Sequence, residues 1–139
     1  FCTPFLDADA RAEEARVRAT PEYQAIGGAN ETEQFLAQSK HLQAHAAPLP
    51  MQRFLDHLEH AVEIAGIDHV GIGSDYDGIW RTPQGLEDAS CYGNLIAALL
   101  ESSFDESDVL KITGGNMERV FRAVTGPGTR AAEATLTPM

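Results

Sequence analysis

The sequence predicts an α/β fold, and three observations carry that prediction. Residues 67–75 place Val70 and Ile72 in alternation with glycines, which is the period of two that a β-strand shows. An amphipathic helix is expected directly before this run, and an Asp-Gly turn directly after it. Helix, strand and then an acid at the strand's carboxyl end is the arrangement in which α/β enzymes place catalytic groups. Asp75 is therefore a candidate catalytic acid.

Length, charge and cysteine content limit the classes of protein to consider. The 139 residues suffice for one domain, and a net charge of −11 argues against a nucleic-acid partner, because a phosphate-binding surface needs clustered Lys and Arg. The ten basic residues are instead scattered along the chain. No apolar run approaches the roughly 20 residues of a membrane span. Cys2 and Cys91 lie far apart and are expected to be free thiols.

Residues 1–6 predict the end of a β-strand. They are mostly apolar, and Pro4 suits a strand end rather than a central strand, because proline cannot donate a hydrogen bond to the ladder. A chain that opens inside a strand is expected to start partway through a domain.

Residues 7–50 predict a long helical connection. Asp7 or Asp9 can cap a first helix, and Asn30, followed by acids, can cap another that ends at the proline-containing stretch 47–50. Connections in compact domains usually have only a handful of residues. Long helical excursions tend to be lids or oligomer surfaces, so a homo-oligomer is one expectation.

Residues 51–65 show the strongest helical pattern in the chain. Apolar side chains recur there at three- and four-residue spacing on one face, and Gly66 suits the left-handed residue that ends a helix. The expected apolar face consists of Met51, Phe54, Leu55, Leu58, Val62 and Ala65.

Further helices are expected in the C-terminal third. Asp88 or Ser90 can cap the first, Asp105 can cap a shorter one, and Asn116 can cap the last. Residues 129–139 are expected to form a flexible tail.

The expected elements leave one strand without partners. A single strand cannot form a sheet, because its backbone donors and acceptors need a neighbouring strand. Two explanations are open: the protein is largely helical and contains no such strand, or the partner strands lie in another polypeptide.

Several motifs occur at close spacing between residues 54 and 124. They are Asp56-His57-Leu58-Glu59-His60, the run from Ala65 to Gly78, Gly85-Leu86-Glu87-Asp88, Gly114-Gly115-Asn116 and Arg119-Val120-Phe121. Together they resemble the C-terminal part of the membrane (renal-type) dipeptidases, peptidase family M19.

The resemblance implies a fold that this chain cannot complete alone. It implies the C-terminal part of a (β/α)8 TIM barrel, a fold that needs about 250 residues. Residues 1–6 would end strand seven, 51–65 would be helix seven and 69–75 strand eight. Residues 7–50 would be the connection after strand seven, and residues 1–128 as a whole would be the C-terminal segment of the barrel.

The resemblance also implies a zinc-dependent dipeptidase that hydrolyses dipeptides with a metal-activated water. The family's ligands for its two zinc ions lie upstream of the matching region, so no metal ligand is expected in this chain, and the N-terminal segment of the same enzyme is the expected partner. Asp75 is the one active-site residue that carries over, as a base toward the water and then an acid toward the departing amine. Tyr76 could contact the substrate or pack under the loop.

Two other functions stay open from the sequence. The chain could be a non-catalytic barrel remnant that acts as a folding or interaction partner. It could also be a small metal-binding protein that uses His57, His60 and His69, because two histidines three apart on a helix can hold zinc. Arg81 could meet a substrate carboxylate, although a structural role is the stronger expectation.

Overall fold

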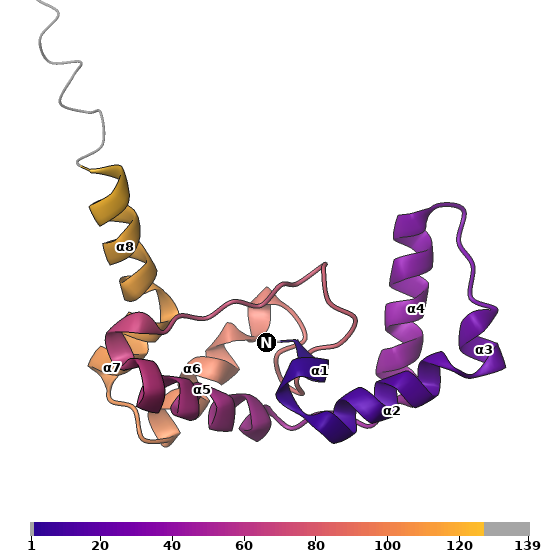
Figure 1. Ribbon diagram of the computed structural model, residues 1–139, viewed down its shortest axis with the longest axis horizontal. Helices are drawn as coiled ribbons and strands as arrows, with labels where there is room; N and C mark the ends of the chain where they lie inside the picture. The colour runs from indigo at the N-terminus through magenta and orange to yellow at the C-terminus, as the bar shows by residue number, and fades with distance from the viewer. Residues whose placement is uncertain (1, 127–139) are drawn as a thin grey trace, which may run out of the picture.

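Residues 2–126 are described by the computed structural model, and they form helices joined by loops and extended segments (Figure 1). No β-strand occurs within this range. The predicted α/β class is therefore wrong for this structure, and so is the predicted TIM-barrel segment. None of the helices in residues 2–126 is long and apolar enough to cross a membrane. The expected flexible tail, residues 129–139, lies outside the described residues.

The expected strand end at the N-terminus is the short helix α1 (Thr3–Leu6). Pro4 lies in its first turn, where a missing backbone N–H leaves no helical hydrogen bond unmade. The N–H of Phe5 closes the turn by donating to the carbonyl of Cys2 at 3.0 Å. Pro4 therefore suits the first turn of a helix as well as the end of a strand, and the apolar composition of residues 1–6 did not distinguish the two.

The expected strand at 67–75 is a 3-10 turn, η1 (Ile67–His69), followed by backbone without regular secondary structure. Val70 has the extended dihedral angles of a strand, φ −112° and ψ 140°. Its neighbour Ile72 donates its N–H to the carbonyl of Ile112 at 3.2 Å, a residue in a helical turn. The alternating pattern thus predicted an extended stretch, but a strand also requires a paired neighbour, and residues 2–126 supply none.

The larger hydrophobic core is shared by α5 (Met51–Ala65), α6 (Tyr92–Glu101), α7 (Glu106–Leu110) and the turn η3 (Lys111–Gly115). The turn η2 (Ala89–Cys91) leads into α6. The buried members of this larger core are Phe54, Leu55, Leu58, Leu86, Leu95, Leu99, Phe104, Val109 and Ile112. The boundaries predicted for α5 are confirmed, and Gly66 ends that helix with φ +86°.

A second, smaller core lies in the N-terminal excursion. This part contains α2 (Ala8–Arg18), α3 (Pro21–Gln24) and α4 (Glu31–His45). Its buried members are Val17, Tyr23, Leu42 and Ala46, with Ile26 and Trp80 packed against them. The helices predicted within residues 7–50 are confirmed, and Asp7 and Asn30 cap α2 and α4 as expected. Figure 1 shows α4 rising from the α2 end of the molecule, beside the loop that joins α5 to α6.

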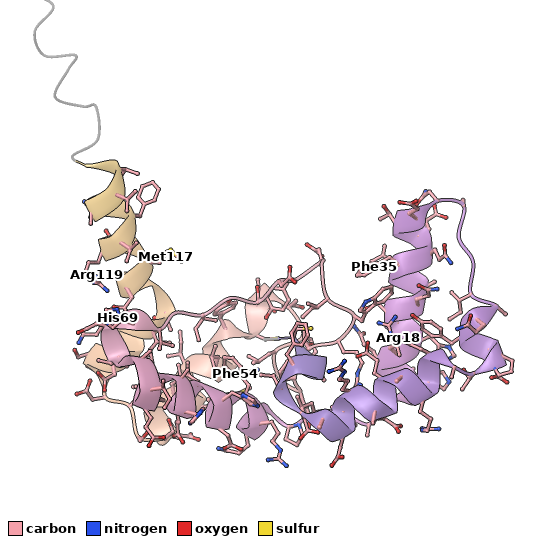
Figure 2. The ribbon with its side chains drawn as sticks, in the orientation of Figure 1. Arg18, Phe35, Phe54, His69, Met117 and Arg119 are labelled. Carbon is pink, nitrogen blue, oxygen red and sulfur yellow. The ribbon has the colours of Figure 1, made fainter. Side chains whose placement is uncertain are left out.

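The last helix, α8 (Asn116–Thr125), projects away from the other helices (Figure 1). Asn116 was expected to cap it but is its first residue, and its side-chain amide donates instead to the carbonyls of Ile67 and Val70 at 2.7 and 2.8 Å. Figure 2 shows Met117 and Arg119 on different sides of this helix.

Candidate functional site

Asp75 opens a tight turn that ends at Gly78. The N–H of Gly78 donates to the carbonyl of Asp75 at 3.1 Å, and Asp75 and Asp77 both adopt positive φ values, 55° and 67°. Non-glycine residues in this region store about 1–3 kcal/mol of strain each and are found preferentially at functional sites. A Cβ on Gly78 would lie 2.6 Å from Oδ1 of Asp75. Glycine at position 78 therefore lets the Asp75 carboxylate fold over its own turn.

The carboxylate of Asp75 is exposed, and within residues 2–126 it forms no ion pair with a lysine or arginine. The negative charge of Asp75 also acts on the thiol of Cys2. The pKa of this thiol is raised by burial first and then by the carboxylates of Glu14 and Asp75. Asp75 can therefore accept a proton or a hydrogen bond from a small molecule without first breaking a salt bridge.

Tyr76 is half-buried directly after Asp75. Its hydroxyl donates to the carbonyls of Leu86 and Asp88 at 3.2 and 2.9 Å, and its ring meets Tyr92 edge-on at 6.4 Å between centroids. Burial, with smaller contributions from Tyr92 and nearby acids, raises its pKa to about 12. The phenol therefore stays protonated at neutral pH and ties the turn to residues 86–88. Its predicted contact with a substrate stays a prediction.

A cavity of about 700 Å³ lies beside the turn. One wall is α4, which contributes Phe35 and Leu36, and the opposite wall is the loop, which contributes Tyr76, Asp77 and Ile79. Figure 2 places Phe35 on the side of α4 that faces this loop. The cavity has the size of an ordinary small-molecule site.

The loop is held against the excursion at Trp80. The Ser39 hydroxyl of α4 donates to the Trp80 carbonyl at 2.7 Å, and the Phe35 ring lies 4.4 Å from the indole between centroids. The guanidinium of Arg18 lies 4.3 Å from the centroid of the indole, in a cation–π contact. Neither Trp80 nor Ser39 is among the site residues predicted from the sequence, although a lone tryptophan inside a polar loop is a signal that the loop packs against another element.

Arg81 is only 3% exposed and lies on the inner side of the same loop. Its Nη2 donates to the carbonyl of Ala47, while its own carbonyl accepts the Thr3 hydroxyl at 3.0 Å. Burial lowers its pKa, against the opposing charges of Glu14 and Glu13. These contacts join α1, the end of α4 and the loop, which fits the structural role expected of Arg81.

The histidines proposed as metal ligands have separate neighbours. His57 Nε2 lies 2.6 Å from the Leu6 carbonyl, His60 Nδ1 lies 3.7 Å from a Glu63 carboxylate, and His69 is in η1. Within residues 2–126 no three His, Cys, Asp or Glu side chains come together in a way that could hold a metal ion. The described residues therefore do not fit a zinc ion.

Comparisons with known proteins agree on one class, the dipeptidases. Dipeptidase 3 of Homo sapiens is 46% identical over 69 residues, which are 50% of this chain and 14% of that protein. Dipeptidase tcpJ of Claviceps purpurea (strain 20.1) is 43% identical over 74 residues, 53% of this chain and 17% of that protein. The family model described as membrane dipeptidase (peptidase family M19) matches residues 17–134. The chain belongs to this family, and it spans only a small part of the curated relatives that it matches.

Proposed function

We propose that this chain is part of a dipeptidase and that Asp75 is its catalytic residue. One observation carries the proposal: an exposed carboxylate stands on a strained turn, inside the region that the M19 family model matches. The cavity beside this turn supplies room for a small substrate.

Asp75 would act on protons during hydrolysis. An ionised carboxylate can accept a proton from the attacking water through Oδ1 or Oδ2 and return it to the nitrogen of the departing amine. Tyr76 would keep the turn in place through its bonds to the carbonyls of Leu86 and Asp88. The zinc dependence that the resemblance implies finds no ligand set in residues 2–126. We expect zinc ligands only in a part of the protein outside this chain.

The N-terminal segment of the same enzyme is the partner that we propose. Large apolar side chains on several elements are between 65% and 81% exposed, which is costly for a surface in water. They are Phe5, Ile64, Leu110, Met117, Phe121 and Val124. The curated relatives are far longer than this chain, so a further segment is available in such proteins to cover these side chains. The chain would then be active only together with that segment.

A non-catalytic remnant that acts as a folding or interaction partner is the second candidate. One observation favours it, namely the large exposed apolar side chains named above, which would serve an interaction partner whether or not the chain takes part in catalysis. This candidate does not explain why Asp75 presents an exposed carboxylate on a strained turn.

The test is dipeptide hydrolysis by the whole protein that carries this chain. Asp75→Asn keeps the size and the tolerance for positive φ but removes the base, so kcat should fall by at least ~100-fold. Asp105→Asn is the matched control, because asparagine caps a helix as well as aspartate does and Asp105 caps α7. Near-wild-type turnover of the Asp75 variant would refute its catalytic role. A whole protein that cuts no dipeptide would favour the non-catalytic candidate.

A further inference from the structure

We propose that the cavity between α4 and the loop binds an apolar side chain of the dipeptide's N-terminal residue, so that α4 sets substrate preference. This inference rests on the proposed function, because it takes the scissile bond to lie at Asp75.

The position of the cavity suits a side-chain subsite. Tyr76 and Asp77, which directly follow Asp75, line the cavity. Neighbouring Cα atoms in a peptide are about 3.8 Å apart, so a dipeptide whose scissile bond is at Asp75 has both side chains within a few ångströms of the turn. One of them can therefore reach the space between the loop and α4.

The walls of the cavity favour an apolar side chain. Phe35 and Leu36 from α4 and Ile79 from the loop supply its large aliphatic and phenyl surfaces, beside the smaller polar contributions of residues such as Thr32 and Gln43. Leu36 is 58% exposed, so its apolar surface is still available for contact with a ligand. Burying that surface against a leucine-sized side chain removes apolar area from water on both partners.

The charged residues of the cavity decide which end of the dipeptide enters. Three carboxylates line it, those of Asp77, Glu87 and Asp88. The Gly85 N–H fixes Glu87 at 2.7 Å, and the Ser90 N–H and hydroxyl fix Asp88 at 2.8 and 2.6 Å. These bonds lower the pKa of both groups, which are ionised at neutral pH. Their negative field attracts the free ammonium of the N-terminal residue and repels the free carboxylate at the other end.

Arg81 is the one Lys or Arg that lines the cavity among residues 2–126, and it does not reverse this preference. Arg81 is almost fully buried, its Nη2 is bonded to the Ala47 carbonyl, and its Nη1 has no surface in contact with solvent. A ligand in the cavity therefore meets the carboxylates before it meets the guanidinium. An acidic side chain is accordingly disfavoured here relative to leucine or a similar apolar side chain.

The shape of this subsite is fixed before the substrate arrives. Ser39 and Phe35 join α4 to Trp80 of the loop, so the two walls are held at one separation. A site whose walls are already in place spends less conformational entropy on binding.

The experiment compares dipeptides in the whole protein that carries this chain. Leu36→Ala shortens an exposed side chain, so the fold should survive, and kcat/KM for Leu-Gly should fall about tenfold while Gly-Leu and Gly-Gly change little. Leu100→Ala is the matched control, since Leu100 is 46% exposed on α6, which contributes no residue to this cavity. The second variant, Leu36→Lys, should also raise kcat/KM for Glu-Gly relative to Leu-Gly, because it adds a cation to the wall.

The outcomes separate this inference from the proposed function. Wild-type hydrolysis with an unchanged preference in both Leu36 variants, or with an equal loss for all three dipeptides, would overturn the subsite alone. A wild-type protein that cuts no dipeptide would overturn the proposed function and the subsite together. Selective loss on Leu-Gly, restored in part by Leu36→Met, supports the subsite, because methionine has a similar apolar volume.

Discussion

The hydroxyl of Ser39 donates a 2.7 Å hydrogen bond to the carbonyl of Trp80, which lies 41 positions later in the chain. Phe35 and Arg18 contact the indole of the same residue, at 4.4 and 4.3 Å between centres. The loop after the Asp75 turn is therefore held by the helical excursion at Trp80 as well as by the larger core, to which its Leu86 belongs. This gives the excursion a structural task, beyond the lid or oligomer surface that its length suggests.

Trp80→Ala should loosen the contact between the loop and α4. Trp80 is half-buried, so we expect a loss of about 2–3 kcal/mol in the free energy of unfolding, somewhat below the cost of removing a fully buried tryptophan. Urea denaturation followed by circular dichroism measures this change. Phe5→Ala is the control, since Phe5 is 81% exposed and its loss should cost little. Equal losses in the two variants would show that the indole contacts contribute nothing.

Asn30→Ala should destabilise α4 from its N-terminus. The Asn30 side chain accepts the Glu33 N–H at 2.9 Å, and the Glu33 carboxylate accepts the Ala29 N–H at 3.0 Å. Removing such a cap costs about 1 kcal/mol, whereas Asn30→Ser keeps an acceptor and should cost much less. Thermal unfolding compares the two variants. Identical melting temperatures for them would contradict the capping role.

Leu99→Ala should be among the most damaging single changes in the chain. Leu99 has no exposed surface in the larger core, and truncation of such a side chain leaves a cavity that costs about 2–5 kcal/mol. Leu110→Ala removes the same atoms at a position that is 71% exposed and should change stability by less than about 0.5 kcal/mol. Denaturant midpoints distinguish the two, and similar midpoints would contradict the assignment of the core.

Tyr76 should make stability depend on pH only in the alkaline range. Its folded pKa of about 12 lies above the ordinary value of 10.0, so folding favours the protonated phenol. This contribution is fully present below about pH 10 and is lost as pH rises through about 12. Unfolding free energies measured across that interval should fall more steeply for the wild type than for Tyr76→Phe. Parallel curves would contradict a raised pKa at this site.

The apolar face of α8 should matter for assembly rather than for the stability of this chain. Phe121 is 65% exposed, so Phe121→Ser should leave the unfolding midpoint of this chain unchanged. In the whole protein the same change should reduce recovery of the chain with the N-terminal segment, because it removes apolar contact area. Arg122→Ser is the control, since Arg122 is exposed and its bonds within the described part of the chain go to Glu118 of the same helix, at 2.6 and 2.9 Å. Equal recovery of both variants would exclude this face from the interface.

Local chemistry made several helices predictable from the sequence. Asp7, Asn30 and Asp105 accept backbone N–H groups within three residues, so each cap is visible in a few adjacent letters. Gly66 likewise ends α5 with a positive φ that glycine adopts freely. The strand predicted at residues 67–75 is wrong because a strand needs a neighbouring strand, which is supplied by residues far away in the sequence. The N–H of Ile72 donates instead to the carbonyl of Ile112 in a helical turn.

The candidate site could be predicted only in part for the same reason. Asp75 lies in a recognisable motif, and an Asp-Gly turn was predicted directly after it, but Asp75 was expected at the end of a strand and instead opens the turn itself. The cavity beside it depends on the contacts of Ser39 and Phe35 with Trp80. These residues are far apart in the sequence, so no local pattern predicts the contacts. Asn116 shows the same limit, because a residue with the chemistry of a cap bonds instead to carbonyls 46 and 49 positions earlier.

The hydrogen bond from Thr3 to the Arg81 carbonyl has a consequence for the order of folding. It joins residues 78 positions apart, so the intervening chain must lose loop-closure entropy before the contact can form. Helices such as α5 form from neighbouring residues on a much faster timescale. Contacts at the loop should therefore appear late in refolding, and the fluorescence of Trp80, the one tryptophan in the sequence, should reach its native value after the helical signal has recovered.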